Sequence, residues 1–294
     1  MRAAVVRAFG GPEAVEVVEA ELPEPSAGQV RIKVAAAALN PIDAGMRSGA
    51  FGGENQQLGL GWDVAGTVEA TGDTGVWNVG DQVVALDYGM AKPLGTHAEY
   101  VVLGADSVAK APATVEAVAA ATLPLNALTA TQALDVLELT PGQSLLVTGA
   151  AGALGGFAVQ LAAHRGITVT GLARRTDEEL VRSLGATGFT TEGGGSYDAV
   201  LDAAVLGEAA LDWIRDGGAY VGVIPQAEPA SVRGVRTASV LVRPDGTRLA
   251  ELARLVDEGV LTLRVAETFA LDEAVKAHAR LAEGGLRGRL VLVP

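Results

Sequence analysis

Residues 143–163, QSLLVTGAAGALGGFAVQLAA, carry the strongest fold signal in the chain. An apolar run at residues 144–147 leads into Gly149, Gly152 and Gly155, and residues with helical spacing follow. This order predicts a buried strand, a tight turn and a helix whose first N–H groups face one point. Those N–H groups and the helix dipole together attract a pyrophosphate. The sequence therefore predicts a dinucleotide-binding turn.

The spacing of the three glycines is G-x-x-G-x-x-G rather than the more familiar G-x-G-x-x-G. The placement of the glycines between a strand and a helix is what favours a cofactor site. The alternative is a plain turn rich in Gly and Ala. The predicted cofactor contacts in the turn are Gly149, Ala150, Ala151, Gly152, Ala153, Leu154 and Gly155.

Strands and helices alternate on both sides of this turn. Apolar runs predict strands at residues 145–148, 168–172, 199–202 and 219–224, and periodicity predicts helices at 153–165, 177–184 and 208–214. Two further helices, at 113–123 and 127–137, precede them. Such alternation with continuous apolar strands predicts a doubly wound parallel sheet.

The first part of the chain is different, because short alternating runs are separated by Gly and Pro. Strands are predicted at residues 3–7, 14–18, 29–35, 64–71, 82–86 and 98–103, which favours a small barrel or a partly rolled sheet. Beyond Pro225, an edge strand (238–242), a helix (246–258) and a final strand, helix and strand (261–269, 271–283, 290–293) are expected to return to this first domain.

Composition excludes several classes of protein. The chain of 294 residues is 49% hydrophobic, which is typical of a folded globular protein. It has no cysteine, so disulfides, thiol nucleophiles and cysteine-ligated metals are excluded. The net charge of −13, from 22 basic and 35 acidic side chains, argues against nucleic acid as a partner. We expect neither a membrane span nor a secretory signal, and therefore a cytoplasmic protein.

Several segments together resemble one family. They are NPIDAGMRSG (40–49), GWDVAG (61–66), VGDQV (79–83), AEY (98–100), LNALTATQAL (125–134), AAGALG (150–155) and the ending GRL (288–290). Their order and spacing resemble the medium-chain dehydrogenase/reductase superfamily. The chain is most similar to the zinc-independent quinone oxidoreductase branch, which includes zeta-crystallin.

The resemblance implies a Rossmann domain, which is a doubly wound parallel sheet, and a mainly β, partly barrel-like (GroES-like) catalytic domain. The implied bounds are residues 1–118 and 250–294 for the catalytic domain and 119–249 for the NADPH-binding domain. It also implies a nicotinamide site in the cleft between the domains. A homodimer, formed through the edge strand near residues 239–242, is implied in the same way.

No metal is expected. Zinc-dependent relatives carry a cysteine in place of Asn40 and a His-Glu pair in place of Trp62-Asp63, and the three histidines, at positions 97, 164 and 278, are scattered. Without zinc, nothing strongly polarises an alcohol, so alcohol dehydrogenation is disfavoured. Hydride transfer to a quinone or an α,β-unsaturated carbonyl needs mainly orientation and a donor to the developing oxyanion.

The predicted catalytic residues are Asn40, Tyr88 and Asn126, as polar contacts to the carbonyl of this electrophilic acceptor, with protonation from solvent. Asp43 and Arg47 are expected near the cleft in a structural role. An alternative is that Asn40 and Asp43 simply cap a turn or helix, as Asn-Pro and Asp often do. Tyr88 would then only cover a pocket.

NADPH is the predicted cofactor. An NAD site would place an acidic residue after the second strand, at residues 168–172, whereas here Ala173 is followed by Arg174 and Arg175. Guanidinium groups suit a 2′-phosphate. The alternative is that they are solvated charges at a helix cap, with Asp177 as a partner. Further predicted cofactor contacts are Thr129, Ala203, Val223, Ile224 and Arg287, and Thr129 is alternatively a polar residue at a helix start.

The leading hypothesis is an NADPH-dependent quinone or enone reductase. An enoyl-thioester reductase of lipid or polyketide metabolism is a close alternative. A non-catalytic NADPH-binding or sensing protein is another, because no clear proton donor is evident and a fold does not imply a function. The sequence leaves open the acceptor, one- or two-electron reduction, and the oligomeric state.

Overall fold

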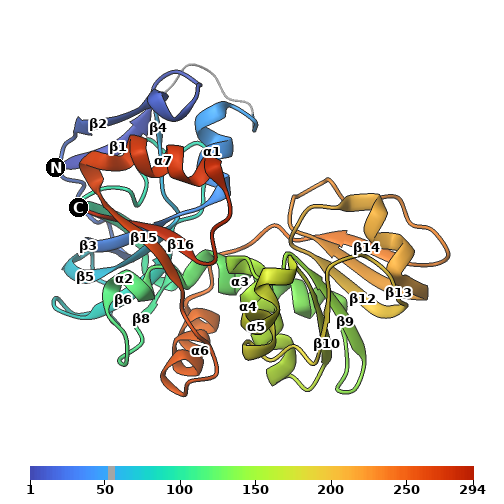
Figure 1. Ribbon diagram of the computed structural model, residues 1–294. Coiled ribbons are helices and arrows are strands. Elements are labelled where there is room, and N and C mark those ends of the chain that lie inside the picture. Colours follow the sequence, from blue (N-terminus) through green and yellow to red (C-terminus); the bar gives the residue numbers. More distant parts are fainter. Residues whose placement is uncertain (52–56) are drawn as a thin grey trace. The chain divides into compact units, whose positions relative to one another are not determined.

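The computed structural model describes residues 1–51 and 57–294, and this chain divides into two compact units (Figure 1). Unit 1 comprises Met1–Leu125, Pro244–Glu258 and Leu263–Pro294, and unit 2 comprises Asn126–Arg243 and Gly259–Thr262. Unit 1 is therefore built from both ends of the chain. The catalytic and cofactor-binding roles and bounds predicted for the two domains stay predictions.

Unit 2 contains a six-stranded sheet in which every neighbouring pair of strands is parallel. Its strands are β9 (Ser144–Thr148), β10 (Thr168–Leu172), β11 (Gly188–Thr190), β12 (Tyr197–Asp202), β13 (Ile214–Gly222) and β14 (Arg236–Ser239). They lie in the order β11-β10-β9-β12-β13-β14, which is the 3-2-1-4-5-6 order of dinucleotide-binding doubly wound sheets. The predicted doubly wound fold is confirmed.

The apolar runs of unit 2 become buried strands, as a parallel sheet covered on both faces requires. Leu145, Leu146 and Val147 in β9 are fully buried. The helices are α3 (Pro124–Leu137), which begins in unit 1, α4 (Ala153–His164) and α5 (Glu178–Ser183), with 3-10 turns η3 (Arg175–Asp177) and η4 (Gly207–Trp213). The strands and α4 position the turn that the sequence singles out.

The described residues of unit 1 form two sheets. The smaller has the order β2-β1-β4, from β1 (Arg2–Val6), β2 (Val15–Glu19) and β4 (Leu58–Gly59). The larger has the order β15-β16-β3-β5-β6-β8, with β7 also paired to β3. Its strands are β3 (Gln29–Leu39), β5 (Asp63–Thr71), β6 (Gln82–Leu86), β7 (Tyr100–Gly104), β8 (Val108–Lys110), β15 (Val265–Ala270) and β16 (Arg289–Val293). In the described residues this sheet is open rather than a closed barrel.

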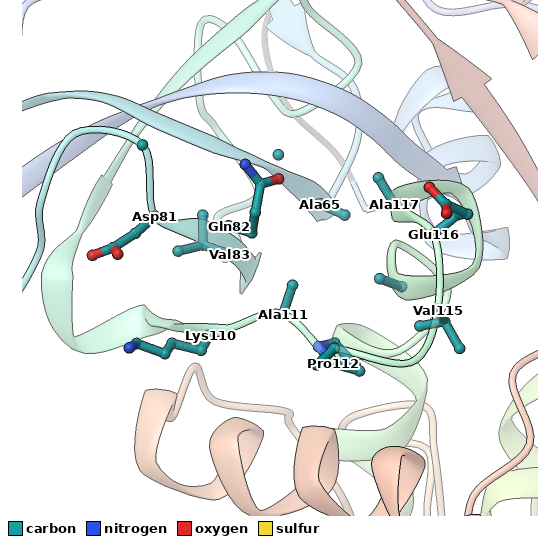
Figure 2. A pocket seen from close by; sticks show the side chains of 14 residues that line it. Ala65, Asp81, Gln82, Val83, Lys110, Ala111, Pro112, Val115, Glu116 and Ala117 are labelled. Carbon is teal, nitrogen blue, oxygen red and sulfur yellow. The ribbon is translucent and has the colours of Figure 1, made fainter.

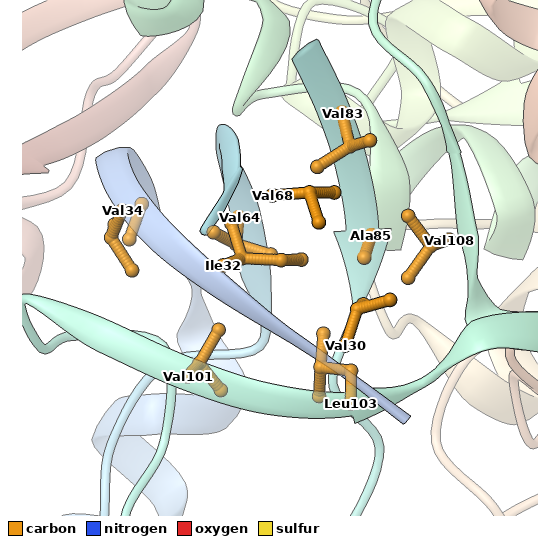
Figure 3. Close-up of a cluster of buried hydrophobic side chains, with 11 residues drawn as sticks. Val30, Ile32, Val34, Val64, Val68, Val83, Ala85, Val101, Leu103 and Val108 are labelled. Atoms are coloured by element: carbon orange, nitrogen blue, oxygen red, sulfur yellow. The ribbon is translucent and has the colours of Figure 1, made fainter. Parts of the chain in front are cut away.

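One hydrophobic cluster of the core of unit 1 is formed by side chains of the larger sheet (Figure 3). Val30, Ile32 and Val34 alternate along β3 and meet Val64 and Val68 of β5. Because strand side chains alternate between faces, this period of two buries one whole face of the strand. The same packing fixes the register of β5, and so the position of Asp63 at its start.

Helices complete unit 1. They are α1 (Pro41–Ser48), α2 (Ala117–Ala120), α6 (Gly246–Asp257) and α7 (Ala274–Glu283), with 3-10 turns η1 (Pro12–Ala14), η2 (Ala105–Ser107) and η5 (Leu271–Glu273). Asp245 caps α6 by accepting a hydrogen bond from the Arg248 N–H at 2.8 Å. Through α7, β15 connects to the parallel strand β16, which pairs with β3.

Several predicted bounds were wrong for identifiable reasons. The helix predicted at 113–123 is reduced to α2, because the N–H groups of Ala113 and Thr114 donate to the Asp257 carboxylate at 3.1 and 2.9 Å. The segment predicted as a helix at 208–214 is the 3-10 turn η4, and β13 follows it directly at Ile214, which leaves no room for further helical turns. Strand β13 ends at Gly222 rather than residue 224, and β3 continues to Leu39.

Candidate active site

The turn after β9 is closed by its own backbone. Gly149 has φ of 60°, and its carbonyl accepts the Gly152 N–H at 2.9 Å. A Cβ at position 155 would lie 2.2 Å from the Gly149 oxygen, so a side chain there would collide with the turn. Helix α4 begins directly afterwards at Ala153. The turn and helix start, residues 149–155, therefore have the shape that a dinucleotide pyrophosphate requires.

The ends of β9 and β12 are joined by a buried polar network that the sequence analysis missed. Thr148 Oγ1 donates to Asp202 Oδ1 at 2.6 Å and accepts the Ala204 N–H at 2.9 Å. Asp202 Oδ2 accepts the Tyr220 hydroxyl at 2.9 Å. Burial, and then the hydrogen bond to Asp202, raises the pKa of Tyr220. This network fixes the carboxyl edge of the sheet where its strand order reverses, which is where cofactors bind in such sheets.

Predicted apolar cofactor contacts lie along this same carboxyl edge, because all these strands are parallel. Ala203 follows β12, and Val223 and Ile224 follow β13. Ile224 is 39% exposed and the neighbouring Val205 58% exposed. Large apolar side chains left exposed at a strand edge are suited to contact a planar ring of a cofactor.

Arg174 and Arg175 follow β10 at this edge, and both side chains are exposed. Arg174 Nε lies 3.4 Å from Asp177 Oδ2, with Arg174 64% exposed and Asp177 1% exposed. The predicted alternative partner, Asp177, is therefore in reach of Arg174. The exposed guanidinium keeps further donors on its terminal nitrogens, so this contact and a phosphate contact are chemically compatible.

The remaining predicted cofactor residues lie elsewhere in the chain. Thr129 is in α3 and 6% exposed. Arg287 belongs to unit 1, just before β16, with an exposed side chain and a carbonyl that accepts Arg264 Nη1 at 3.1 Å.

In unit 1, Asn40 and Asp43 form the start of α1, as the structural alternative predicts. Asp43 Oδ2 accepts the Asn40 N–H at 2.8 Å, and its Oδ1 accepts the Gly61 N–H at 2.7 Å. Asp43 is fully buried and Asn40 is 1% exposed. Both carboxylate oxygens of Asp43 thus fix backbone, which holds α1 against the segment that precedes β5.

Asp63, at the start of β5, is a further buried acid that the sequence analysis did not single out. Its Oδ2 accepts Asn40 Nδ2 at 2.6 Å, and its Oδ1 accepts the Leu125 N–H in the first turn of α3 at 2.6 Å. Burial raises the pKa of Asp63 to about 7, against the opposing effects of these hydrogen bonds and of Arg289. The amide nitrogen of Asn40 is therefore already used inside the protein.

Arg47, on α1, is a buried cation. Its side chain is 7% exposed, and Nε and Nη1 find no hydrogen-bond partner among the described residues. Burial lowers the pKa of Arg47. Nearby in the same unit, the rings of His97 and His278 meet edge to face at 6.4 Å, and burial lowers the pKa of His278 to about 3.

Of the three predicted catalytic side chains, Tyr88 has the largest exposed fraction. It is 40% exposed, against 1% for Asn40 and 3% for Asn126 in α3. The Tyr88 ring meets the Trp62 ring edge to face, with centroids 5.4 Å apart. Tyr88 follows β6 and Trp62 precedes β5, so both lie at the sheet edge that also carries Asp63.

A separate pocket of about 490 Å³ opens in unit 1 beside β5, β6, β8 and α2 (Figure 2). Asp81, Lys110 and Glu116 are the charged residues that line it, and it contains none of the predicted site residues. Lys110 lies at the end of β8, on the opposite side of the opening from Glu116. The pocket does not bring together an acid, a base and a nucleophile in the manner of a catalytic site.

Known proteins resemble this chain along its whole length. Residues 26–113 match the alcohol dehydrogenase GroES-like domain and residues 176–292 match the zinc-binding dehydrogenase family. An NADPH-dependent alkenal/one oxidoreductase of Arabidopsis thaliana is 33% identical, over 100% of this chain and 80% of the relative. The quinone oxidoreductase of Coxiella burnetii has the same fold, with a TM-score of 0.90, 31% identity, and coverage of 100% and 99%.

The chain belongs to the medium-chain dehydrogenase/reductase superfamily. The resemblance to its quinone oxidoreductase branch is thereby confirmed. A mycobacterial member of this superfamily fold, solved as a complex with NADPH, has a TM-score of 0.83 and 26% identity over the full length of both chains.

The indole N–H of Trp62 donates to Met46 Sδ at 3.3 Å. An indole offers a metal no lone pair, because its nitrogen is a donor only. Among residues 1–51 and 57–294, no group of three or more His, Cys, Asp or Glu could hold a metal ion. No helix in the same residues is long and apolar enough to cross a bilayer.

Proposed function

We propose that this member of the superfamily is an NADPH-dependent reductase of quinones or α,β-unsaturated carbonyl compounds. The observation that carries the proposal is the turn at residues 149–155, where a Cβ at Gly155 would lie 2.2 Å from the Gly149 oxygen. The missing side chain at Gly155 lets α4 pack closely on the turn, and the small residues of the turn would let a pyrophosphate approach the backbone. Relatives act in this way, as the alkenal/one oxidoreductase and the quinone oxidoreductase do by name.

The residues of this chain would hold NADPH at two points. The first turn of α4, from Ala153, would bind the pyrophosphate through its positive helix end. Arg174 and Arg175 would bind the 2′-phosphate through guanidinium groups. When bound, NADPH supplies the hydride, so the protein itself needs to orient the acceptor and stabilise the negative charge that develops on its oxygen.

Tyr88 is the side chain that we propose for that oxygen. Its exposed ring carries a hydroxyl donor, and its edge-to-face contact with Trp62 limits its movement. Asn40 and Asn126 are proposed as further polar contacts to the acceptor, and the hydrogen bond from Asn40 to Asp63 would fix the orientation of the Asn40 amide. The proton that completes the reduction of an enone would come from solvent.

We further propose that the reaction needs no zinc. The support is chemical: the sequence has no cysteine, and the Trp62 indole donates its N–H to Met46. Added zinc or a chelator should therefore leave the rate unchanged. A chelator-sensitive rate would contradict this part of the proposal.

A homodimer in the cytoplasm is also proposed. Strand β14 is the last strand of the six-stranded sheet, and the nearby Leu241 is 52% exposed. An unpaired edge strand beside exposed apolar surface favours pairing with a second copy. Light scattering at several concentrations tests the dimer, and Leu241→Lys should shift it toward the monomer.

The experiment that tests the function is the initial rate of NADPH and NADH oxidation, followed by absorbance, with separate panels of quinones, enones and enoyl thioesters. NADPH-selective turnover of quinones or enones supports the proposal. Turnover of the enoyl thioesters alone would establish the alternative reductase, and saturable NADPH binding without any turnover would indicate a sensor.

A further inference from the structure

The loop after β6 is anchored by one nearly buried lysine. Lys92 Nζ donates to the Gly61 carbonyl at 2.7 Å, to the Asp87 carbonyl at 2.8 Å and to Asp87 Oδ2 at 2.8 Å. The Lys92 and Asp87 side chains are 11% and 14% exposed. An ammonium group has three donors, and all three are used here. Lys92 therefore joins the start of its own loop to the segment before β5.

The same ammonium group holds the aromatic pair. Lys92 Nζ lies 4.9 Å from the centroid of the Trp62 ring, within the range of a cation–π interaction. Trp62 in turn meets Tyr88 edge to face at 5.4 Å with an interplanar angle of 85°. The Asp87 N–H also donates to the Trp62 carbonyl at 2.7 Å. Lys92, Trp62 and Tyr88 are thus one contiguous assembly.

The returning arm of the loop is equally constrained. A Cβ at Gly59 would lie 2.2 Å from the Leu94 carbonyl carbon, and a Cβ at Gly95 would lie 2.2 Å from the Leu60 oxygen. Backbone therefore packs directly on backbone on this arm. Between the two fixed arms, Tyr88 and Met90 remain 40% and 38% exposed. The buried contacts of the loop hold its backbone in place, and an aromatic and a thioether side chain remain exposed to solvent.

A buried lysine–aspartate pair is weak support for stability, because desolvation offsets most of its attraction. Burial raises the pKa of Asp87 while Lys92 opposes that effect, which is the balance expected of a desolvated pair. An apolar pair would hold a loop at lower cost in desolvation. The gain from this pair is the fixed direction of its hydrogen bonds and of the ring contact.

We propose that Lys92 is a positioning residue, which fixes Tyr88 through Trp62 so that the Tyr88 ring and hydroxyl, together with the exposed Met90 of the same loop, select planar conjugated acceptors over short aliphatic ones. This inference rests on the proposed reductase function. A planar ring gains contact area from Tyr88 and Met90, whereas a short aliphatic enone reaches only the hydroxyl.

Lys92→Met is the first test, because it keeps the apolar stem and removes the ammonium group. We expect the KM for an aromatic quinone to rise about 10-fold, the KM for a short aliphatic enone to change less than about twofold, and the Kd for NADPH to stay constant. Lys110→Met, an exposed lysine at the separate pocket, is the matched control. Asp87→Asn is the second variant, and serves if Lys92→Met does not fold.

A double-mutant cycle separates positioning from a merely structural role. Tyr88→Ala should raise the quinone KM as Lys92→Met does, and the double variant should be no worse than either single variant, because both act through one contact surface. Additive effects in the cycle, or equal losses for quinone and aliphatic enone, would overturn the inference.

A binding measurement that needs no turnover can test this inference separately from the proposed reductase function. Quenching of tryptophan fluorescence by a non-reducible aromatic ketone measures the surface directly, with no NADPH present. If the wild-type protein turns over no acceptor, the reductase proposal fails, and weaker quenching in Lys92→Met still supports the aromatic surface. Identical quenching in both proteins would overturn it.

Discussion

Asp63 accepts a hydrogen bond from the side-chain amide of Asn40 at 2.6 Å, and both side chains are at most 1% exposed. The contact joins the end of β3, where Asn40 begins α1, to the start of β5. The other oxygen of Asp63 holds Leu125. One buried carboxylate therefore fixes three segments that are distant in sequence, and its protonation affects all of them.

Asp63→Asn should destabilise unit 1 in a pH-dependent way. The pKa of Asp63 is raised to about 7, so the folded protein binds a proton that the unfolded chain releases near its ordinary value of 3.8. The contribution of Asp63 is thus fully present below that ordinary value and is lost as pH rises through about 7. The loss of stability in Asp63→Asn should be largest near pH 4 and shrink toward pH 8, as measured by urea unfolding. A constant difference across this range would contradict the prediction.

The pH dependence of stability that His278 contributes should have the opposite sign, and His278→Leu should remove it. Burial lowers the pKa of His278 to about 3, so the unfolded chain takes up a proton below its ordinary value of 6.5 while the folded protein does not. Wild-type stability should fall as pH drops from about 6.5, by about 2 kcal/mol at pH 5 from this one residue. The free energy of unfolding, measured in urea at several pH values, should depend less on pH in His278→Leu than in the wild-type protein. His164→Gln, at an exposed position, is the control.

Arg174→Ala with Arg175→Ala should reverse cofactor preference. Loss of charge-assisted hydrogen bonds to a 2′-phosphate should raise the KM for NADPH about 10-fold or more and leave the KM for NADH unchanged. Initial rates with each cofactor measure this. Arg182→Ala removes a comparable exposed charge, paired with Glu178 on α5, and should have no effect on either KM. Equal losses for both cofactors would show that the arginines act on folding instead.

Gly155→Ala should destabilise unit 2 more than Gly152→Ala. The added Cβ would lie 2.2 Å from the Gly149 oxygen at position 155 but 3.1 Å from it at position 152. We expect overpacking to lower the free energy of unfolding by about 1–3 kcal/mol in Gly155→Ala, and by clearly less in Gly152→Ala. Thermal unfolding without cofactor measures this, and equal losses would argue against the tight turn.

Much of unit 2 follows from its sequence, because a parallel sheet needs continuous apolar strands and the glycines fix the turn. Residues 168–172 were predicted with the bounds of β10, and the helix from Ala153 begins where expected. The carboxyl edge could be inferred because parallel strands end together. The 3-10 turn η4 could not be predicted, because the replacement of an α-helix by this turn depends on how β12 and β13 pack.

Unit 1 was less predictable, since its sheet depends on pairing between distant segments. The cap of helix α1 by Asn40 and Asp43 was open to prediction because it is local, whereas the contact of Asp43 with the Gly61 N–H, across 18 positions in sequence, was not. Asp63 looked like one more acidic residue in a strand. The role of Lys92 could not be predicted from its sequence neighbours. It depends on contacts with Gly61, Asp87 and Trp62 that exist only in the folded protein.

The arrangement of unit 1 has a consequence for synthesis on the ribosome. Strand β3 pairs on one side with β16, which follows unit 2 in the sequence, whereas unit 2 needs no residue after Thr262. Since domains fold as their residues emerge, unit 2 can be complete while β3 still has an unpaired edge. Until Arg289–Val293 leaves the exit tunnel, that edge is open to other nascent chains. A strand that is translated after unit 2 therefore protects a much earlier strand from aggregation.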